Sequence, residues 1–475
     1  MIRFFRVNAV YQLISLTILL ALMRLPFVFY PLPLLIPELQ WLLVGEKMGQ
    51  GFMLYRDVWD NIGPLAAAIY WAIDVIFGRS QFAYQIIAGI LTLFQAFYFN
   101  YISNQRQLFT ERNYVPGMLY LVFMNISFDC STLSPALMAN TFLLLAFGTL
   151  IKQMQREGAT NEVFEAGFYL SIATLFYLPA LVFIVWIFFS LLLYTGSNFR
   201  QHTLTFFGFV FPIAFILLLF FFRNSLNDLN RNLLISSIQA RQYNLNDFQS
   251  VLIVLFLPIL FGLLGFFRTV SYGRFVNFQT RVQQIMLLWL VAAAVSIILM
   301  PYLAPMQFIV FLPPVVFFTT NFFLLFRKRW LAEIIFLSLL FGVLFIQYQG
   351  VTNIIPNWNT LQLNNLRTKN APLPVAIQKQ KILVIGKNEG EYRDNFPATA
   401  YLNWDLARYD LENVNNYASV ISIFDNFTAD PPTYIVDKAN LVPKIFARLP
   451  ELAKDYHPTQ WKGIYQRNFV GIRKK

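Results

Sequence analysis

Apolar runs recur about ten times between Asn8 and Gly350, and many are long enough to cross a lipid bilayer as helices. A hydrocarbon core about 30 Å thick needs roughly 20 helical residues per crossing. The composition agrees, because 57% of the residues are hydrophobic and only 13% are charged. The sequence therefore predicts a polytopic membrane protein whose membrane part is all α-helical.

We expect about 11 transmembrane helices, each corresponding to one apolar run. They are expected near residues 8–30, 82–103, 114–127, 136–151, 167–178, 179–196, 204–222, 250–267, 282–300, 305–326 and 331–349. The pair at 167–178 and 179–196 also fits one long helix kinked at Pro179. Both interpretations of this pair stay open.

Lysine and arginine gather in alternate loops, as in the loops that contain Arg106 and Arg268. Because cytoplasmic loops carry an excess of these residues, the bias predicts a cytoplasmic N-terminus. An odd number of crossings then puts the C-terminal segment outside. We expect an integral protein of the bacterial inner (cytoplasmic) membrane, and its low cysteine usage is compatible with that location.

The first outer loop, residues 31–81, contains two short apolar stretches at 38–49 and 66–78. Making the second stretch a span would reverse every later loop and spoil the charge bias. We expect both to be interfacial helices, with Leu39, Leu42 and Leu43 of the first available to enter lipid. Together they would form a roof over an outward cavity.

The sequence changes character after Gly350, which defines the domain organisation. We expect a transmembrane domain at residues 1–350, a polar Asn-rich linker at 351–380 and an extracytoplasmic α/β domain at 381–475. Strands are expected at "KILVIG" (381–386), "ASVISIF" (418–424) and "TYIVD" (433–437), and a helix at 441–454.

Carboxylates gather in two outer loops, where Glu38, Asp57 and Asp60 precede the second span and Asp129 follows the third. A carboxylate at the mouth of a cavity can take a proton from an attacking hydroxyl group. The other interpretation is structural, because Asp57, Asp60 and Asp129 can cap helices. Glu38 can likewise favour a helix dipole.

Three further features of the sequence indicate which ligands the protein can bind. Arg24 lies near the outer end of the first span, and its forked donors suit a phosphate at the lipid boundary. The one cysteine and two separated histidines exclude a zinc cluster, whereas Mg²⁺ or Mn²⁺ held by Glu38 and Asp57 stays open. The net charge of +12 is explained by basic loops, so no nucleic-acid partner is expected.

A longer pattern surrounds these residues. Arg24 is followed by "PE" at 37–38, Gly51, "YRDVWDNIGPL" at 55–65 and "FGRSQFA" at 77–83. This pattern resembles the GT-C superfamily of membrane glycosyltransferases, particularly the branch of protein O-mannosyltransferases and the lipid A aminoarabinose transferase. The resemblance is good over roughly the first 85 residues and looser across the remaining spans.

The resemblance implies an enzyme that moves a sugar from a polyprenyl-phosphate donor in the membrane lipid to an extracytoplasmic protein, lipid or glycan, with inversion. The implied catalytic residues are Glu38, Asp57, Asp60 and Asp129, and the implied donor-binding residues are Arg24, Tyr55 and Arg56.

One departure supports a different function. The catalytic base in this family is usually the Asp of an Asp-Glu pair, and Pro37 occupies that position here. The alternative is therefore a non-catalytic GT-C-like subunit or scaffold with a protein partner in the cell envelope. A transporter is disfavoured, because the acids cluster in outer loops and not at mid-membrane.

Overall fold

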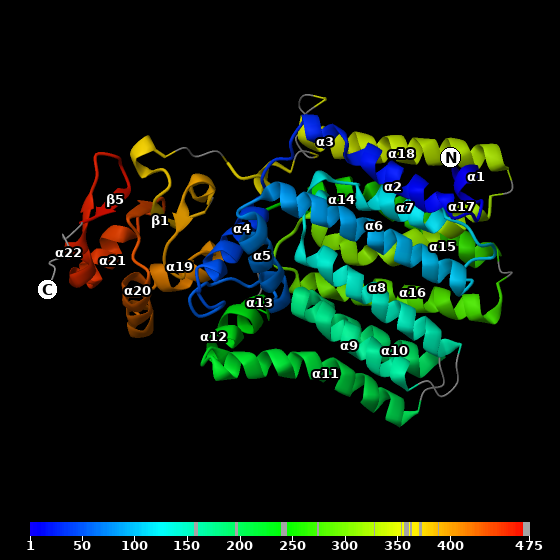
Figure 1. Ribbon diagram of the computed structural model, residues 1–475, viewed down its shortest axis with the longest axis horizontal. Helices are drawn as coiled ribbons and strands as arrows, with labels where there is room; N and C mark the ends of the chain where they lie inside the picture. The colour runs from blue at the N-terminus through cyan, green and yellow to red at the C-terminus, as the bar shows by residue number, and fades with distance from the viewer. Residues whose placement is uncertain are drawn as a thin grey trace.

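The computed structural model describes residues 1–155, 160–194, 198–238, 245–272, 275–326, 328–352, 354–355, 361, 363–369, 373–387 and 389–468. Within them, each predicted span corresponds to a helix of one bundle (Figure 1). The main helices are α2 (Tyr11–Arg24), α6 (Gln81–Gln105), α7 (Val115–Met124), α8 (Pro135–Met154), α9 (Asn161–Phe176), α10 (Phe183–Tyr194), α11 (Phe199–Phe222), α15 (Phe256–Tyr272), α16 (Asn277–Ser296), α17 (Leu312–Leu324) and α18 (Arg329–Thr352).

Shorter elements extend or join these helices. They are α1 (Ile2–Phe5), α3 (Pro26–Phe29), η1 (Phe128–Ser131), η2 (Leu178–Val182), α12 (Leu226–Leu229), the π-helix η3 (Asn230–Ile235), α13 (Ser236–Ile238), α14 (Phe248–Val254), η4 (Ile297–Leu299) and η5 (Pro305–Phe311). By length and composition, 7 described helices can cross a membrane, or 8 if α14 and α15, bent by 64°, form one span. The chain is thus an integral membrane protein. Helices α7, α9 and α10 are shorter than the helices counted as spans.

The open question at Pro179 is decided in favour of two helices. Helix α9 ends at Phe176, and Pro179 lies in the 3₁₀ turn η2 before α10 begins at Phe183. Proline lacks an N–H group and clashes with the preceding turn, so it favours a break between helices. The resulting turn lies beside the first outer loop and contributes to the cavity described below.

The basic loops meet at one end of the bundle, opposite the C-terminal sheet. At that end Arg6 donates to Glu111 at 2.7 Å, and Arg268 donates to the carbonyl of Leu325 at 2.8 Å. The N-terminus also lies there, whereas the C-terminal sheet lies at the other end (Figure 1). The N-terminus and the C-terminal sheet thus lie at opposite ends of the bundle, while the predicted cytoplasmic side of the N-terminus stays a prediction. We call the end near the sheet the cavity end, because the cavity described below lies there.

Two helices of the first outer loop, α4 (Ile36–Gly49) and α5 (Pro64–Phe77), lie between the bundle and the C-terminal sheet (Figure 1). Gly63 and Pro64 start α5, because proline is preset for the first helical position. Gly78 ends α5 with φ of 65°, a conformation that glycine adopts without strain. The two helices predicted in this loop are therefore present.

The prediction that α4 would contact lipid is wrong. Its side chains Leu39, Leu42 and Leu43 are at most 5% exposed, because α4 packs against protein on several sides. It is instead α5 that has an exposed apolar face, where Val75 is 63% and Ile76 is 70% exposed.

The C-terminal segment forms a five-stranded sheet in the order β2-β1-β3-β5-β4. The strands are β1 (Lys381–Ile385), β2 (Phe396–Pro397), β3 (Tyr434–Asp437), β4 (Tyr456–Pro458) and β5 (Ile464–Arg467). Strand β1 is parallel to β2 and β3, whereas β5 is antiparallel to β3 and β4. The accompanying helices are α19 (Trp404–Glu412), α20 (Tyr417–Ala429), α21 (Val442–Arg448) and α22 (Pro450–Asp455), with 3₁₀ turns η7 (Asn364–Leu366), η8 (Val375–Ile377) and η9 (Gly390–Asp394).

The strands predicted at 381–386 and 433–437 are confirmed by β1 and β3, but the strand predicted at 418–424 is wrong. That segment is helix α20, whose start is capped by Asn416 accepting the Ala418 N–H at 3.0 Å. Its buried residues Ser419, Ile423 and Phe427 are spaced four apart, which is helical periodicity. The helix predicted at 441–454 is divided into α21 and α22, which begins at Pro450.

The described part of the predicted linker is packed against the first outer loop. Leu35 forms an antiparallel bridge with Arg367, and the Thr368 N–H donates to the Leu34 carbonyl at 2.8 Å. Leu366 is fully buried. This segment therefore holds the sheet close to α4.

Ion pairs and an aromatic side chain join the first outer loop to the C-terminal sheet. Lys47 of α4, whose side chain is 0% exposed, contacts Asp430 at 2.7 Å. Arg79 pairs with Glu46 and donates to the Tyr392 carbonyl at 2.7 Å. Trp59 packs within the hydrophobic core of the C-terminal sheet. The outer loop is thus fixed to the sheet on one side and to the bundle on the other.

Candidate functional site

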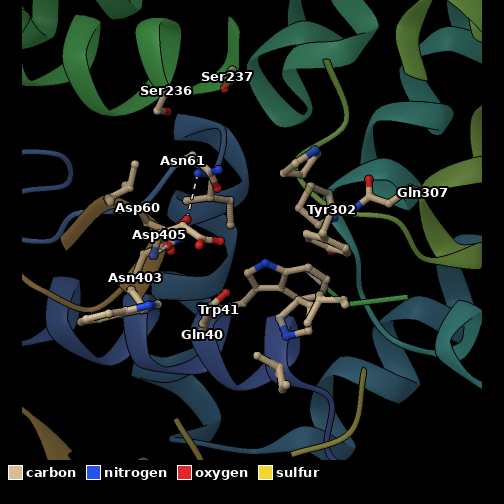
Figure 2. A pocket seen from close by; sticks show the side chains of 18 of the residues that line it. Gln40, Trp41, Asp60, Asn61, Ser236, Ser237, Tyr302, Gln307, Asn403 and Asp405 are labelled. Carbon is tan, nitrogen blue, oxygen red and sulfur yellow. Dashed lines mark hydrogen bonds between the residues drawn. The ribbon is translucent and has the colours of Figure 1, made fainter. Parts of the chain in front are cut away.

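A cavity of about 420 Å³ lies where the helix bundle, the first outer loop and the C-terminal domain meet. The loop contributes α4 and residues 60–63. The bundle contributes η2, the first residue of α8 and residues before and within η5, and the C-terminal domain contributes α19. Figure 2 shows Gln40 and Trp41 rising from α4, with Asp60 and Asp405 on one side and Tyr302 and Gln307 on the other. Groups from distant parts of the sequence therefore share one space.

Asp60 is the predicted acid that lines this cavity, and a tight turn fixes its position. The turn is closed by the Tyr55 hydroxyl, which donates to the Ile62 carbonyl at 2.6 Å. Asp60 itself is 3% exposed, and its Oδ1 accepts the Ile62 N–H at 2.9 Å. The adjacent Trp59 N–H donates to the Ala400 carbonyl at 2.9 Å. Both the loop and the C-terminal domain therefore position this carboxylate.

Glu38 lies next to the cavity, but Pro37 faces it. Pro37 lines the cavity, whereas Glu38 is 1% exposed and is not among the lining residues. The Glu38 carboxylate accepts hydrogen bonds from Thr132 at 2.5 Å and Gln81 at 2.9 Å. Burial raises its pKa to about 7, although these hydrogen bonds oppose the shift. Glu38 therefore connects α4 to the bundle.

Asp57, Arg56 and Tyr55 lie in the same turn as Asp60 but do not line the cavity. Arg56 makes two hydrogen bonds of 2.9 Å to Asp57, and its side chain is 51% exposed. Asp57 also accepts the Met53 N–H at 2.9 Å. Tyr55 is fully buried, adopts φ of 69° and donates its hydroxyl within the turn. In this structure these three residues shape the loop that carries Asp60.

Asp129 lies behind the wall of the cavity, not on it. It is 0% exposed, and its Oδ2 accepts the Met306 N–H at 2.8 Å. Burial raises its pKa to about 6, although hydrogen bonds oppose the shift. Because Met306 precedes Gln307, Asp129 fixes the backbone of a residue that does line the cavity.

Arg24 lies between helices outside the cavity. Its Nε donates to Asn125 at 3.1 Å, and its Nη1 donates to the Gln85 carbonyl at 3.3 Å. Its Nη2 is buried without a hydrogen-bond partner among the described residues. The structure does not bring Arg24 together with Asp60.

Several residues of the cavity were not identified from the sequence, because they lie far along the chain. Glu389 and Asp405 add carboxylates, and Tyr302 and Gln307 add neutral polar groups. Cations come from Lys369, Lys387 and Arg408. No local motif marks these positions. Their common property is proximity to the cavity end, which hydropathy cannot reveal.

Glu389 is the most unusual of these groups electrostatically. It is 5% exposed, its Oε1 accepts from Gln40 at 3.2 Å, and its Oε2 has no hydrogen-bond partner among the described residues. Burial raises its pKa to about 8, and the carboxylates of Asp60 and Asp405 act in the same direction. Hydrogen bonds from Gln40 and the Trp404 backbone oppose the shift. Glu389 is therefore mostly protonated at pH 7 and can donate a hydrogen bond.

The sequence leaves open a divalent cation held by Glu38 and Asp57. Among the residues that the structure describes, no group of three or more His, Cys, Asp or Glu side chains could hold a metal ion. The carboxylate oxygens of Glu38 and Asp57 instead accept the hydrogen bonds given above.

Comparisons with known proteins concern the family and the fold. The "Family of unknown function (DUF6427)" matches residues 65–355. No curated protein matches the sequence. An oligosaccharyltransferase of Archaeoglobus fulgidus in the apo form has a similar structure, with a TM-score of 0.50 and 12% identity over 95% of this chain and 75% of that chain.

A second similar structure is ArnT from Cupriavidus metallidurans bound to undecaprenyl phosphate, with a TM-score of 0.49 and 13% identity over 73% of this chain and 67% of that chain. At these identities a structural likeness concerns the fold alone. The likeness to the oligosaccharyltransferase supports the GT-C fold that was predicted from the sequence pattern of roughly the first 85 residues. The chain thus belongs to the DUF6427 family and has the GT-C fold.

Proposed function

We propose that this protein is an integral membrane glycosyltransferase that moves a sugar from a polyprenyl-phosphate donor to an acceptor in the cavity. The single observation that carries the proposal is Asp60, a carboxylate held by a closed turn inside a cavity at one end of the helix bundle. The GT-C fold supports the same kind of reaction by analogy of fold alone. In this proposal the cavity opens on the extracytoplasmic side of a bacterial inner membrane.

Asp60 acts as the general base in the proposed reaction. Of the four acids predicted from the sequence, it alone is among the lining residues. Its carboxylate accepts the proton of an acceptor hydroxyl, whose oxygen attacks the anomeric carbon of the donor sugar. The bond between that carbon and the phosphate oxygen breaks, and the anomeric configuration inverts.

The leaving group is polyprenyl phosphate, which gains negative charge as the bond breaks. Lys369, Lys387 and Arg408 line the cavity and can stabilise that charge. Arg24, which lies between helices outside the cavity, has a structural role in this proposal. The polyprenyl chain stays in lipid beside the bundle.

The test replaces Asp60 by Asn in the full-length protein reconstituted in membranes. We expect D60N to reduce sugar transfer by at least about 100-fold, because an amide cannot accept the proton. The comparison variant is D57N, in the same turn but outside the cavity, and it should lose much less activity than D60N, because it changes only the support of the turn. Transfer is measured from extracted polyprenyl-phosphate sugars, with and without added Mg²⁺ or Mn²⁺, and with EDTA. Equal activity in D60N and D57N would remove Asp60 from the mechanism.

A non-catalytic subunit is the second candidate, and the position of Pro37 favours it. Pro37 faces the cavity where the resembling family usually has its acidic base, and the neighbouring Glu38 is bonded to Thr132 and Gln81. This alternative predicts a stable complex with a cell-envelope protein and no binding of polyprenyl phosphate. Co-purification and lipid-binding measurements on the wild-type protein therefore distinguish the two functions.

A further inference from the structure

The wall of the cavity opposite Asp60 carries two buried polar side chains, Tyr302 and Gln307, whose hydrogen-bonding capacity is not filled by the described residues. Gln307 is 1% exposed, and its Oε1 has no hydrogen-bond partner among the described residues. The hydroxyl of Tyr302 is also buried and faces the Gln307 side chain within hydrogen-bonding reach. Both side chains line the cavity (Figure 2). A buried donor or acceptor destabilises the protein when it stays unsatisfied, so the wall favours a ligand that pairs with these groups.

A hydroxyl group has the chemistry that this pair requires. The side-chain oxygen of Gln307 can only accept a hydrogen bond, whereas the Tyr302 hydroxyl can donate one. The Gln307 side chain lies within hydrogen-bonding reach of the Tyr302 hydroxyl, so its amide N–H can donate to Tyr302 while the Tyr302 O–H and the Gln307 Oε1 remain available to a ligand. One ligand hydroxyl can therefore donate to Gln307 and accept from Tyr302.

The same part of the cavity contains an aromatic surface. Trp41 stacks on Tyr70 with ring centroids 5.5 Å apart and planes 5° apart. Trp41 lines the cavity, and Figure 2 shows it between the acidic side and the Tyr302 side. A sugar ring has apolar C–H faces that pack on an aromatic ring, while its hydroxyl groups at the edge reach polar atoms.

The backbone beneath this wall is held in place before any ligand binds. The Met306 N–H donates to Asp129 at 2.8 Å, and the Gln307 N–H donates to the Ala304 carbonyl at 3.0 Å. Further along η5, the Trp289 indole donates to the Val310 carbonyl at 2.7 Å. A prepositioned wall loses less conformational entropy when a ligand binds.

We propose that Trp41, Tyr302 and Gln307 form a subsite for an uncharged, hydroxyl-bearing sugar ring. The inference rests on the proposed function and names the class of sugar that the donor carries. These three side chains are neutral, and the labelled carboxylates Asp60 and Asp405 lie across the cavity (Figure 2). A sugar with an ammonium or carboxylate group would place its charge against this wall without a counterion, which is unfavourable.

The experiment measures binding to the full-length protein in nanodiscs. The probes share one polyprenyl phosphate, which is either bare or linked to glucose, mannose, galactose, glucosamine or glucuronic acid. We expect the best of the three neutral hexoses to bind about tenfold more tightly than the bare lipid, as one or two buried hydrogen bonds allow. Glucosamine and glucuronic acid should show no such gain.

Two variants and one matched control test whether the gain in affinity for neutral sugars depends on Tyr302 and Gln307. Q307L and Y302F should each remove most of the neutral-sugar gain and leave binding of the bare lipid unchanged. The control is Q347L, because Gln347 in α18 is also a buried glutamine whose side-chain atoms find no partner in the described part of the chain, but it does not line the cavity. It should keep the full gain.

The outcomes separate this inference from the proposed function. Binding of the bare lipid without a neutral-sugar gain, an equal gain for charged sugars, or a gain that survives Q307L and Y302F would each overturn the subsite alone. A protein that binds none of the lipids would overturn the proposed function together with the subsite.

Discussion

At the scale of single residues, neighbours in the sequence face different surroundings. Pro37 lines the cavity, whereas Glu38 is turned to Thr132 and Gln81. Asp57 pairs with Arg56 outside the cavity, although it is three positions from Asp60. A helix and a tight turn rotate successive side chains by large angles, so spacing alone does not tell which acid reaches the cavity.

Glu389 gives the clearest pH-dependent prediction at this scale. Its pKa in the folded protein is about 8, compared with an ordinary value of 4.5. Between these pH values the folded protein binds a proton that the unfolded chain releases, so stability falls as pH rises through this window. Each pH unit changes the free energy of unfolding by at most about 1.4 kcal/mol.

We therefore expect E389Q, which cannot ionise, to be more stable than the wild-type protein at pH 8 and similar to it near pH 4.5. Thermal unfolding of the full-length protein across this range gives the difference. The control is E451Q, because Glu451 is exposed on α22. A constant difference between E389Q and the wild type at all pH values would contradict a buried, protonated Glu389.

At the scale of secondary-structure elements, close approach of helices depends on particular glycines. Helix α15 packs on α17, and a Cβ atom added at Gly265 would lie 2.1 Å from the Phe318 carbonyl oxygen. A Cβ atom added at Gly262, three positions earlier on the same helix, would be 3.4 Å from Val315 Cγ1, which is an ordinary contact. Hydropathy predicts both segments as spans, but it does not indicate at which position α15 must lack a side chain so that α17 can approach.

This difference predicts opposite results for two conservative substitutions. G265A should lower the midpoint of thermal unfolding, because separating the backbones costs about 1–3 kcal/mol. G262A should leave the midpoint unchanged or raise it, since alanine favours a helix over glycine by about 1 kcal/mol. The measurement is thermal unfolding in one detergent for both variants. Equal effects would mean that the α15–α17 contact does not depend on the bare backbone at Gly265.

At the scale of the whole molecule, the cavity depends on docking of the C-terminal domain against the first outer loop. Lys47 is central to this docking, because its Nζ contacts Asp430 at 2.7 Å and the Thr399 carbonyl at 2.6 Å. Lys381 also pairs with Asp430, at 2.9 Å. The same interface contains Trp59, one residue before Asp60, so docking and the candidate base are mechanically connected.

Loss of the buried ammonium group should open this interface. We expect K47M to destabilise the docked arrangement by about 3 kcal/mol, because it leaves part of the Asp430 charge uncompensated. Hydrogen exchange should become faster in α4 and in residues 399–430, and sugar transfer should fall as Asp60 loses its support. The control is K444M, since Lys444 is exposed on α21. Unchanged exchange in K47M would show that Lys47 does not hold the domain in place.

The sequence by itself determined the membrane class, the helix at each predicted span, the two helices of the first outer loop and the β1 and β3 strands. These features follow from local hydropathy and from residues such as Gly63, Pro64 and Gly78, which act on the backbone next to them. The sequence could not distinguish strand from helix at α20, because a short apolar run fits both periods.

Only the tertiary structure decided which side chains share the cavity. Asp60 was among the acids predicted from the sequence, but Glu389, Tyr302 and Gln307 join it from positions hundreds of residues away. Burial, the raised pKa of Glu389 and the Gln307 Oε1, which no described residue pairs, arise from contacts between separate elements. Such contacts depend on packing in three dimensions, which neither composition nor local periodicity encodes.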